Sequence, residues 1–104
     1  MRNFRELEIW KDSMQLVTDV NRLLEQFLNN EKFGLTSQIS RSAVSIPSNI
    51  SEGCRGSDKE LVQYLNIALG SSFELETQLE ISYNIKYINK EEFEGLTQRL
   101  NVLL

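Results

Sequence analysis

The sequence contains no histidine, and that absence excludes more than any residue that is present. Without histidine the chain has no Ser-His-Asp or Cys-His nucleophile pair and no His general base near neutral pH. Zinc sites built from cysteine and histidine are excluded, as are di-iron sites that use a Glu-x-x-His motif. The composition therefore predicts a protein that is not an enzyme and has no cofactor.

Cysteine and long apolar runs are scarce as well. The single cysteine, Cys54, excludes an internal disulfide, so the fold does not need an oxidising compartment. No apolar run approaches the roughly 18 residues of a membrane span, and no signal-type apolar segment follows the N-terminus. A length of 104 residues fits one domain. We expect a soluble, cytoplasmic protein with one domain over residues 1–104 and no membrane partner.

The charge balance is acidic, with 15 acidic against 11 basic residues and a net charge of −4. Nucleic-acid-binding proteins usually carry a basic surface, so this balance opposes broad, non-specific RNA binding. The charge is unevenly distributed, however. Residues 32–59 hold more basic than acidic side chains, whereas the only charged side chains in residues 60–85 are glutamates. A locally basic region around the second quarter of the chain therefore remains compatible with an anionic partner.

Apolar residues recur at helical spacing along the whole chain. The pattern predicts four helices: about residues 6–28, about 35–53, Ser57 to about 86, and a fourth that follows Asn89. The third begins at a capping box, Ser57-Asp58-Lys59-Glu60, and Asn89 is a typical N-cap residue. Four helices with short connections are typical of an all-α, antiparallel up-down-up-down four-helix bundle.

Pro47 and the last residues leave two details of this pattern open. Pro47 lies inside the second segment, where it removes the backbone hydrogen bond to Ala43. The apolar stripe continues in phase from Ile46 to Ile50, so we expect a kinked helix, with a break at Pro47 as the alternative. The chain stops on Leu103-Leu104 without a stop signal, which predicts a fourth helix that is cut short or covered at its end.

The first segment has an apolar face wider than one antiparallel neighbour needs. Either the helix is buried between two bundle neighbours, or part of this face meets another subunit. In the third segment, small residues favour close approach of a facing backbone, and the Ser-rich second segment is the natural partner. These small residues are Ala68, Gly70, Ser71 and Ser72.

A polar stripe follows one side of the second segment and is the main candidate site. It is either a solvated face or a surface whose arginines bind phosphate or a partner carboxylate. Its members are Ser37, Arg41, Ser45, Ser48, Glu52 and Arg55. On the third segment, Glu76 and Glu80 indicate a solvated acidic face. If Glu74 points inward, we expect it to pair with Arg41 or Asn49 rather than with a metal ion.

Four stretches of the sequence resemble the signatures of one bacterial family: Phe4–Trp10, Glu31–Ile39, Arg41–Gly53 and Tyr64–Leu79. The chain resembles the four-helix-bundle proteins called S23 ribosomal proteins or 23S rRNA intervening-sequence proteins. Ser51 stands where alanine is more usual. The resemblance implies a left-handed antiparallel four-helix bundle that commonly assembles as a homopentamer and whose molecular function is not established.

The resemblance and the residues together lead to two expectations. The first is a homo-oligomeric binding or scaffold protein that assembles as a pentamer. The alternative is an RNA-binding accessory protein of rRNA, the ribosome or a retroelement reverse transcriptase, since related retroelement accessory proteins are basic pentamers. That alternative needs Arg41 and Arg55, with Lys32 or Lys59, on one surface. The candidate polar network or partner surface comprises Arg41, Ser45, Ser48, Asn49, Glu52, Arg55 and Glu74.

Overall fold

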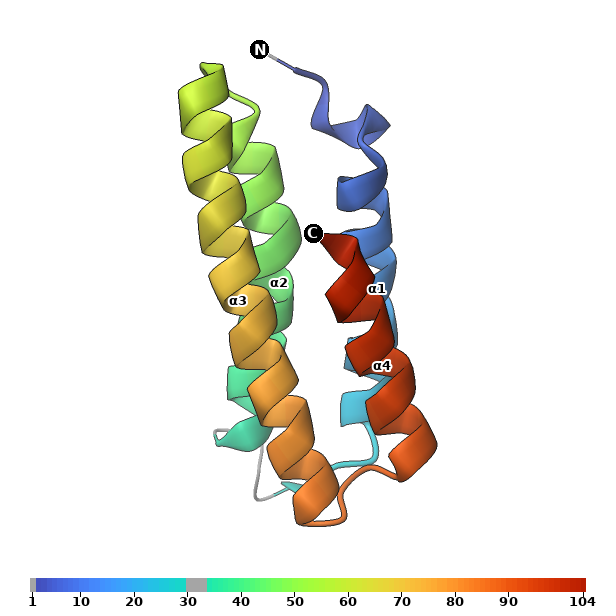
Figure 1. Cartoon of the computed structure of the whole chain (residues 1–104). Helices are drawn as coiled ribbons and strands as arrows, with labels where there is room; N and C mark the ends of the chain where they lie inside the picture. The colour runs from blue at the N-terminus through green and yellow to red at the C-terminus, as the bar shows by residue number, and fades with distance from the viewer. Residues whose placement is uncertain (1, 30–33) are drawn as a thin grey trace.

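The computed structural model describes residues 2–29 and 34–104, and these form helices without any strand. A short 3-10 helix, η1 (Phe4–Glu6), precedes α1 (Glu8–Leu24), α2 (Leu35–Gly53), α3 (Asp58–Asn84) and α4 (Lys90–Leu103). Consecutive helices run in opposite directions, and α4 returns beside α1 to close the bundle (Figure 1). The predicted up-down-up-down four-helix bundle is therefore confirmed. The predicted loop between the first two helices lies largely outside the described residues.

The starts of α3 and α4 are fixed by reciprocal capping. Ser57 Oγ accepts from the Glu60 N–H at 3.2 Å, and the Glu60 carboxylate accepts from the Ser57 N–H at 3.4 Å. At α4, Asn89 and Glu92 exchange the same two bonds, both at 2.8 Å. Each box satisfies two backbone groups that a helix start leaves unpaired, which is why both starts were predictable.

The first helix ends four residues earlier than its apolar pattern predicts. After Leu24 the chain continues in tight turns, in which the Phe27 N–H donates to the Leu24 carbonyl at 3.1 Å. These turns bury Phe27, whose ring meets Tyr87 edge-on with 5.2 Å between centroids. Leu28, the last residue of the predicted stripe, is exposed instead. A contact with the α3–α4 connection therefore overrides the helical pattern.

The helix α2 is continuous through Pro47, so the alternative of a break there is wrong. The kink stays a prediction. On its buried side α2 contributes Ile39, Ala43, Ile46 and Ile50 to the core. The other helices complete this core with Leu16, Val20, Ala68, Leu75, Leu79, Leu96, Leu100 and Leu103.

The most extensive helix pair is α2 with α3, as the small residues predicted. The two helices approach closely at Gly53, where an added Cβ would lie 2.9 Å from Tyr64 Cβ and 3.3 Å from Leu61 Cα. Ala68 and Ser72 are buried in the same interface. Gly70 takes no part in it, because an added Cβ would meet nothing within 4 Å. Its place in the predicted close-packing patch is therefore wrong.

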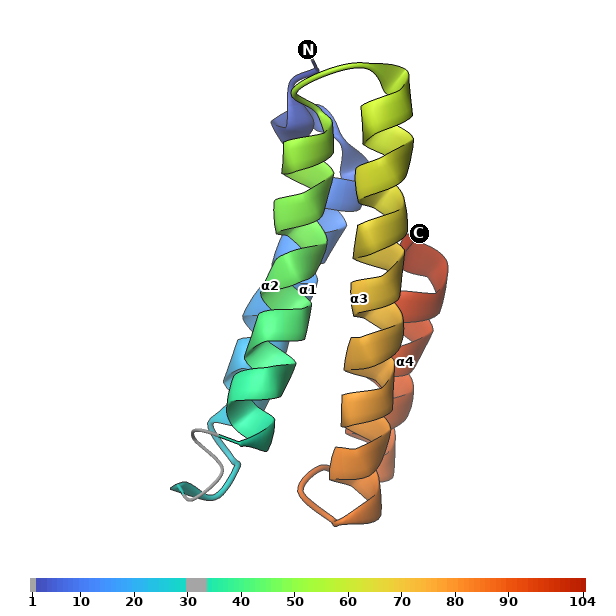
Figure 2. The ribbon, with the colours of Figure 1, turned by 90° about the vertical axis from the view of Figure 1, so that its left-hand side faces the viewer.

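The last two helices of the bundle, α3 and α4, differ in length. The chain ends about halfway along the bundle, because α4 has 14 residues against 27 in α3 (Figure 1). From the side, α3 runs nearly the full height of the molecule, and α2, with 19 residues against 27, is shorter (Figure 2). Within the described residues, no helix has both the length and the apolar character that crossing a bilayer requires.

Candidate functional site

Three of the polar residues at the α2–α3 interface form one hydrogen-bonded group. The Asn49 amide donates to the Ser45 carbonyl at 2.7 Å and to Ser45 Oγ at 2.9 Å. Ser45 Oγ in turn lies 2.8 Å from Ser71 Oγ on α3. The turn of α2 around Ser45 is thereby tied to α3. Because Asn49 and Ser45 are half-buried, these bonds are partly shielded from water.

Glu74, on α3, belongs to a second hydrogen-bonded group. This group meets α2 at Ser42, about one turn before Ser45. The Glu74 carboxylate accepts from Ser42 Oγ at 2.8 Å and from the Gln78 amide at 3.3 Å. The expected pairing of Glu74 with Arg41 or Asn49 is wrong, because Ser42 is the α2 side chain that faces Glu74. The sequence held a signal for this, since Ser42 lies beside the apolar stripe between Ile39 and Ile46. A hydroxyl at a buried helical position needs a partner.

The remaining candidates lie apart from these groups. Ser48 is exposed, and Arg55 forms an ion pair with Glu52 at 2.7 Å. The hydrogen bond that Arg55 donates to the Glu52 carboxylate raises the pKa of Arg55 above its ordinary value. A polar network of all seven candidates stays a prediction; the structure brings together only Ser45 and Asn49, and Glu52 with Arg55.

Arg41 and Arg55 belong to different hollows. Arg41 lines a shallow groove of about 420 Å³ between α1 and α2. Arg55 lines a pocket of about 220 Å³ at the other end of α2, together with Arg2 and Arg5. Arg2 is itself paired with Asp58. The two arginines that the sequence placed on one face are therefore separated along the length of the helix.

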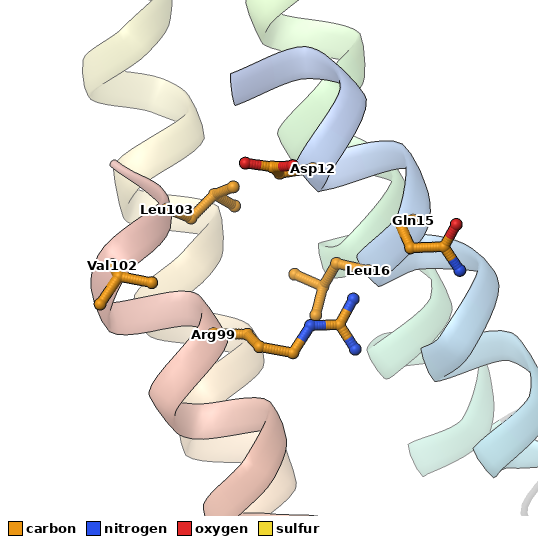
Figure 3. Close-up of a pocket in the computed structure, with 6 residues that line it drawn as sticks. All are labelled: Asp12, Gln15, Leu16, Arg99, Val102 and Leu103. Atoms are coloured by element: carbon orange, nitrogen blue, oxygen red, sulfur yellow. The ribbon is translucent and has the colours of Figure 1, made fainter. Parts of the chain in front are cut away.

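An ion pair between α1 and α4 was not visible from the sequence. Arg99 donates to Asp19 at 2.8 Å, and Gln15 donates to the same carboxylate at 3.1 Å. The hydrogen bond from Arg99 lowers the pKa of Asp19. A small pocket of about 170 Å³ adjoins it, and Figure 3 shows Arg99 reaching from α4 toward Gln15 and Leu16. Asp19 and Arg99 are 80 residues apart, so no local pattern links them.

Among the described residues, exposed large apolar side chains are most numerous along α3. Five residues of α3 and Ile85, which directly follows it, are between 37% and 58% exposed: Val62, Ile67, Leu69, Phe73, Ile81 and Ile85. The face of α1 is instead packed within the chain, where Leu16, Val20 and Leu23 are buried and Trp10 and Val17 are packed against the core. The structure thus favours the interpretation that α1 lies between two bundle neighbours.

The part of the chain that the structure describes holds no cluster of three or more cysteine, aspartate and glutamate side chains able to bind a metal ion. What it offers is polar groups between helices, two shallow hollows lined by arginine, and an exposed apolar helix face. These features define an all-α four-helix-bundle protein whose accessible chemistry lies on its outer surfaces.

The chain belongs to the 23S rRNA-intervening sequence protein family, whose family model matches residues 5–104. It is similar to the crystal structure of a protein of unknown function from the S23 ribosomal protein family of Bacteroides thetaiotaomicron VPI-5482. The two share 29% sequence identity, with a TM-score of 0.83 over 91% of this chain and 90% of that chain. None of the curated proteins matches the chain. The family resemblance seen in the sequence is therefore confirmed.

Proposed function

We propose that this protein is a non-enzymatic, homo-oligomeric binding or scaffold module that assembles as a pentamer in the cytoplasm. The observation that carries the proposal is the uncovered apolar face of α3. The number five comes from the family resemblance. The non-enzymatic role is supported by the absence of histidine from the sequence. A cytoplasmic location fits the single, buried Cys54, which needs no oxidising compartment.

The exposed face of α3 is larger than scattered surface residues would give. Val62, Leu69 and Phe73 are spaced by seven and four residues, so they lie in line on one side of the helix. Ile81 and Ile85 extend the apolar surface toward the end of α3. Exposed large apolar side chains gathered along one helix of a folded domain favour an interaction site there. A protein–protein interface of standard size buries roughly 800 Å² on each partner. Self-association through an interface of that area would use most of this face of α3.

Light scattering combined with size exclusion tests the assembly. We expect wild-type protein at micromolar concentration to have the mass of an oligomer, five chains by native mass spectrometry. The double variant Leu69→Ser, Phe73→Ser should dissociate while keeping its helical circular dichroism. Val102→Ser, which changes an exposed apolar residue on α4, is the matched control and should leave the mass unchanged. A monomeric wild type would contradict the proposal.

The second candidate function is RNA binding, and one observation favours it. Arg2, Arg5 and Arg55 line a single pocket at the end of the bundle. Against it, Arg2 and Arg55 already pair with Asp58 and Glu52. Electrophoretic shifts with rRNA fragments at two salt concentrations discriminate the functions, because phosphate contacts make affinity fall steeply with salt. Arg41 lies in the distant groove, so the single surface with Arg41 and Arg55 that the alternative was expected to need is not formed, and Lys32 lies outside the described residues. RNA binding at the end pocket instead predicts that Arg5→Ala weakens the shift and that Arg41→Ala does not.

A further inference from the structure

Two surfaces in the described part of the chain are unlike each other. One is the outer stripe of α3, where Phe73, Glu76 and Glu80 share a side of the helix. The other is the groove between α1 and α2, which carries Arg41. The stripe belongs to α3 and the groove to α1 and α2, so one molecule cannot bring them together. We propose that they are the two halves of one repeated contact, in which the α3 stripe of one copy docks in the α1–α2 groove of the next.

Each surface carries an exposed apolar side chain. Phe73 projects from α3 with more than half of its surface exposed. The groove continues into a smaller hollow of about 40 Å³, in whose wall Val44 is exposed, and Ser40 lines both parts. That hollow is too small for an aromatic ring, so Phe73 of one copy packs against Val44 at the surface of the next. An exposed aromatic side chain that becomes buried in a contact is a usual anchor of a protein interface.

The charges match as well. Within residues 2–29 and 34–104, neither Glu76 nor Glu80 forms an ion pair, and Arg41 forms none. Glu76 follows Phe73 by one turn, and Arg41 precedes Val44 by one turn, so both spacings are about 4.5 Å along the helix axis. Phe73 can therefore sit against Val44 while Glu76 lies near Arg41.

Glu25 is the one carboxylate among the residues that line the groove, and it directly follows the end of α1. The arginine stands on the α2 side, so the α3 glutamates are expected to face α2 rather than α1. This places the charge contact on the same helix as Val44. A like-charged contact at that position mainly disfavours wrong alignments of the two surfaces.

A contact between two unlike surfaces is a head-to-tail contact, which repeats from copy to copy and ends only when a ring closes. The inference therefore rests on the proposed homo-oligomer and specifies which surfaces build it. It also explains why the apolar face of α3 and the groove lie on different sides of the bundle.

Charge reversal tests the pairing. Arg41→Glu alone and Glu76→Arg with Glu80→Arg should each raise the dissociation constant of the oligomer roughly tenfold or more, measured by light scattering across a dilution series. The triple variant that combines the reversals restores opposite charges at every contact and should recover most of the assembly. Lys59→Glu and Glu91→Arg, both at exposed positions without an ion pair in the described chain, are the matched controls.

The outcomes separate this inference from the proposed function. A monomeric wild type overturns the assembly itself. An oligomeric wild type that is unaffected by both reversals overturns only the pairing of stripe and groove. Weakening by the single reversals without recovery in the triple variant also overturns the pairing, because the charges would then act on different contacts. Circular dichroism of each variant establishes that its subunits remain folded.

Discussion

Asn49 is the residue at which the polar contacts of α2 are concentrated. Its amide donates to both the carbonyl and the hydroxyl of Ser45, which is itself bonded to Ser71. Ser48 is its neighbour in the chain, but the side chain of Ser48 is exposed. Two adjacent polar residues therefore have different environments, and the hydrogen bonds can be tested by comparing them.

We predict that Asn49→Ala lowers the free energy of unfolding by about 1 kcal/mol more than Ser48→Ala does. Alanine gains a similar helix propensity at both positions, roughly 0.5 kcal/mol, so the difference reports the lost hydrogen bonds. Thermal and urea melts of the two variants measure it. Equal small losses would count against a stabilising role for the Ser45–Asn49–Ser71 group.

The second prediction at the residue scale concerns Asp19. Its pKa is lowered chiefly by the hydrogen bond from Arg99, so the folded chain holds this carboxylate more strongly in its charged form than the unfolded chain does. The stabilisation is complete above the ordinary aspartate pKa of about 3.9, and it is lost as the pH falls through the lowered value.

Urea unfolding should therefore show a smaller difference between wild type and Asp19→Asn at about pH 3 than at pH 6, because acid removes the charge that the substitution removes. Asp12→Asn, on the same helix and without an ion pair in the described residues, provides the control. A difference that is independent of pH would show that Asp19 acts by packing instead of by charge.

At the scale of the helices, the tightest constraint is the crossing of α2 and α3 at Gly53. A methyl group there would overlap Tyr64 Cβ and touch the backbone at Leu61, neither of which is the end of a flexible side chain. Gly95, on α4, faces open space, so the same methyl group meets nothing. The two glycines thus separate a packing requirement from intrinsic helix propensity.

We predict that Gly53→Ala destabilises the fold by about 1–3 kcal/mol through overpacking. Gly95→Ala should stabilise it by up to about 1 kcal/mol, because alanine is the better helix former. Urea unfolding of both variants checks the opposite signs. A loss at Gly95 similar to that at Gly53 would mean that backbone freedom, and not the α2–α3 contact, sets the requirement.

At the scale of the whole molecule, the sequence predicts the helices better than their outer contacts. The starts of α3 and α4 are encoded by neighbouring residues, Ser57 with Glu60 and Asn89 with Glu92, so they are visible in the chain itself. The end of α1 is not, because Phe27 leaves the helical pattern to meet Tyr87, sixty residues away. The helix starts are determined by neighbouring residues and can therefore be predicted from the sequence. The end of α1 is determined by a tertiary contact, which local patterns do not show.

The candidate site shows the same division. The members of the polar stripe on α2 can be listed from the sequence, but the periodicity could not say that Glu74 meets Ser42. Nor could it say which apolar face stays uncovered. The width of an apolar face can be read from a helical wheel, whereas its burial depends on which helices pack against it. Two helices, α2 and α4, pack against α1, and in the described chain no helix covers the outer side of α3.

The closing contact between α1 and α4 has a consequence for chain entropy. Ser42 and Glu74 join points 32 residues apart, whereas Asp19 and Arg99 join points 80 apart. By the scaling of loop closure with length, the longer loop costs about 0.8 kcal/mol more. The interface between α1 and α4, the least extensive of the four helix–helix interfaces, thus closes the longest loop. A covalent link between α1 and α4 would therefore remove more conformational entropy from the unfolded chain than one between α2 and α3.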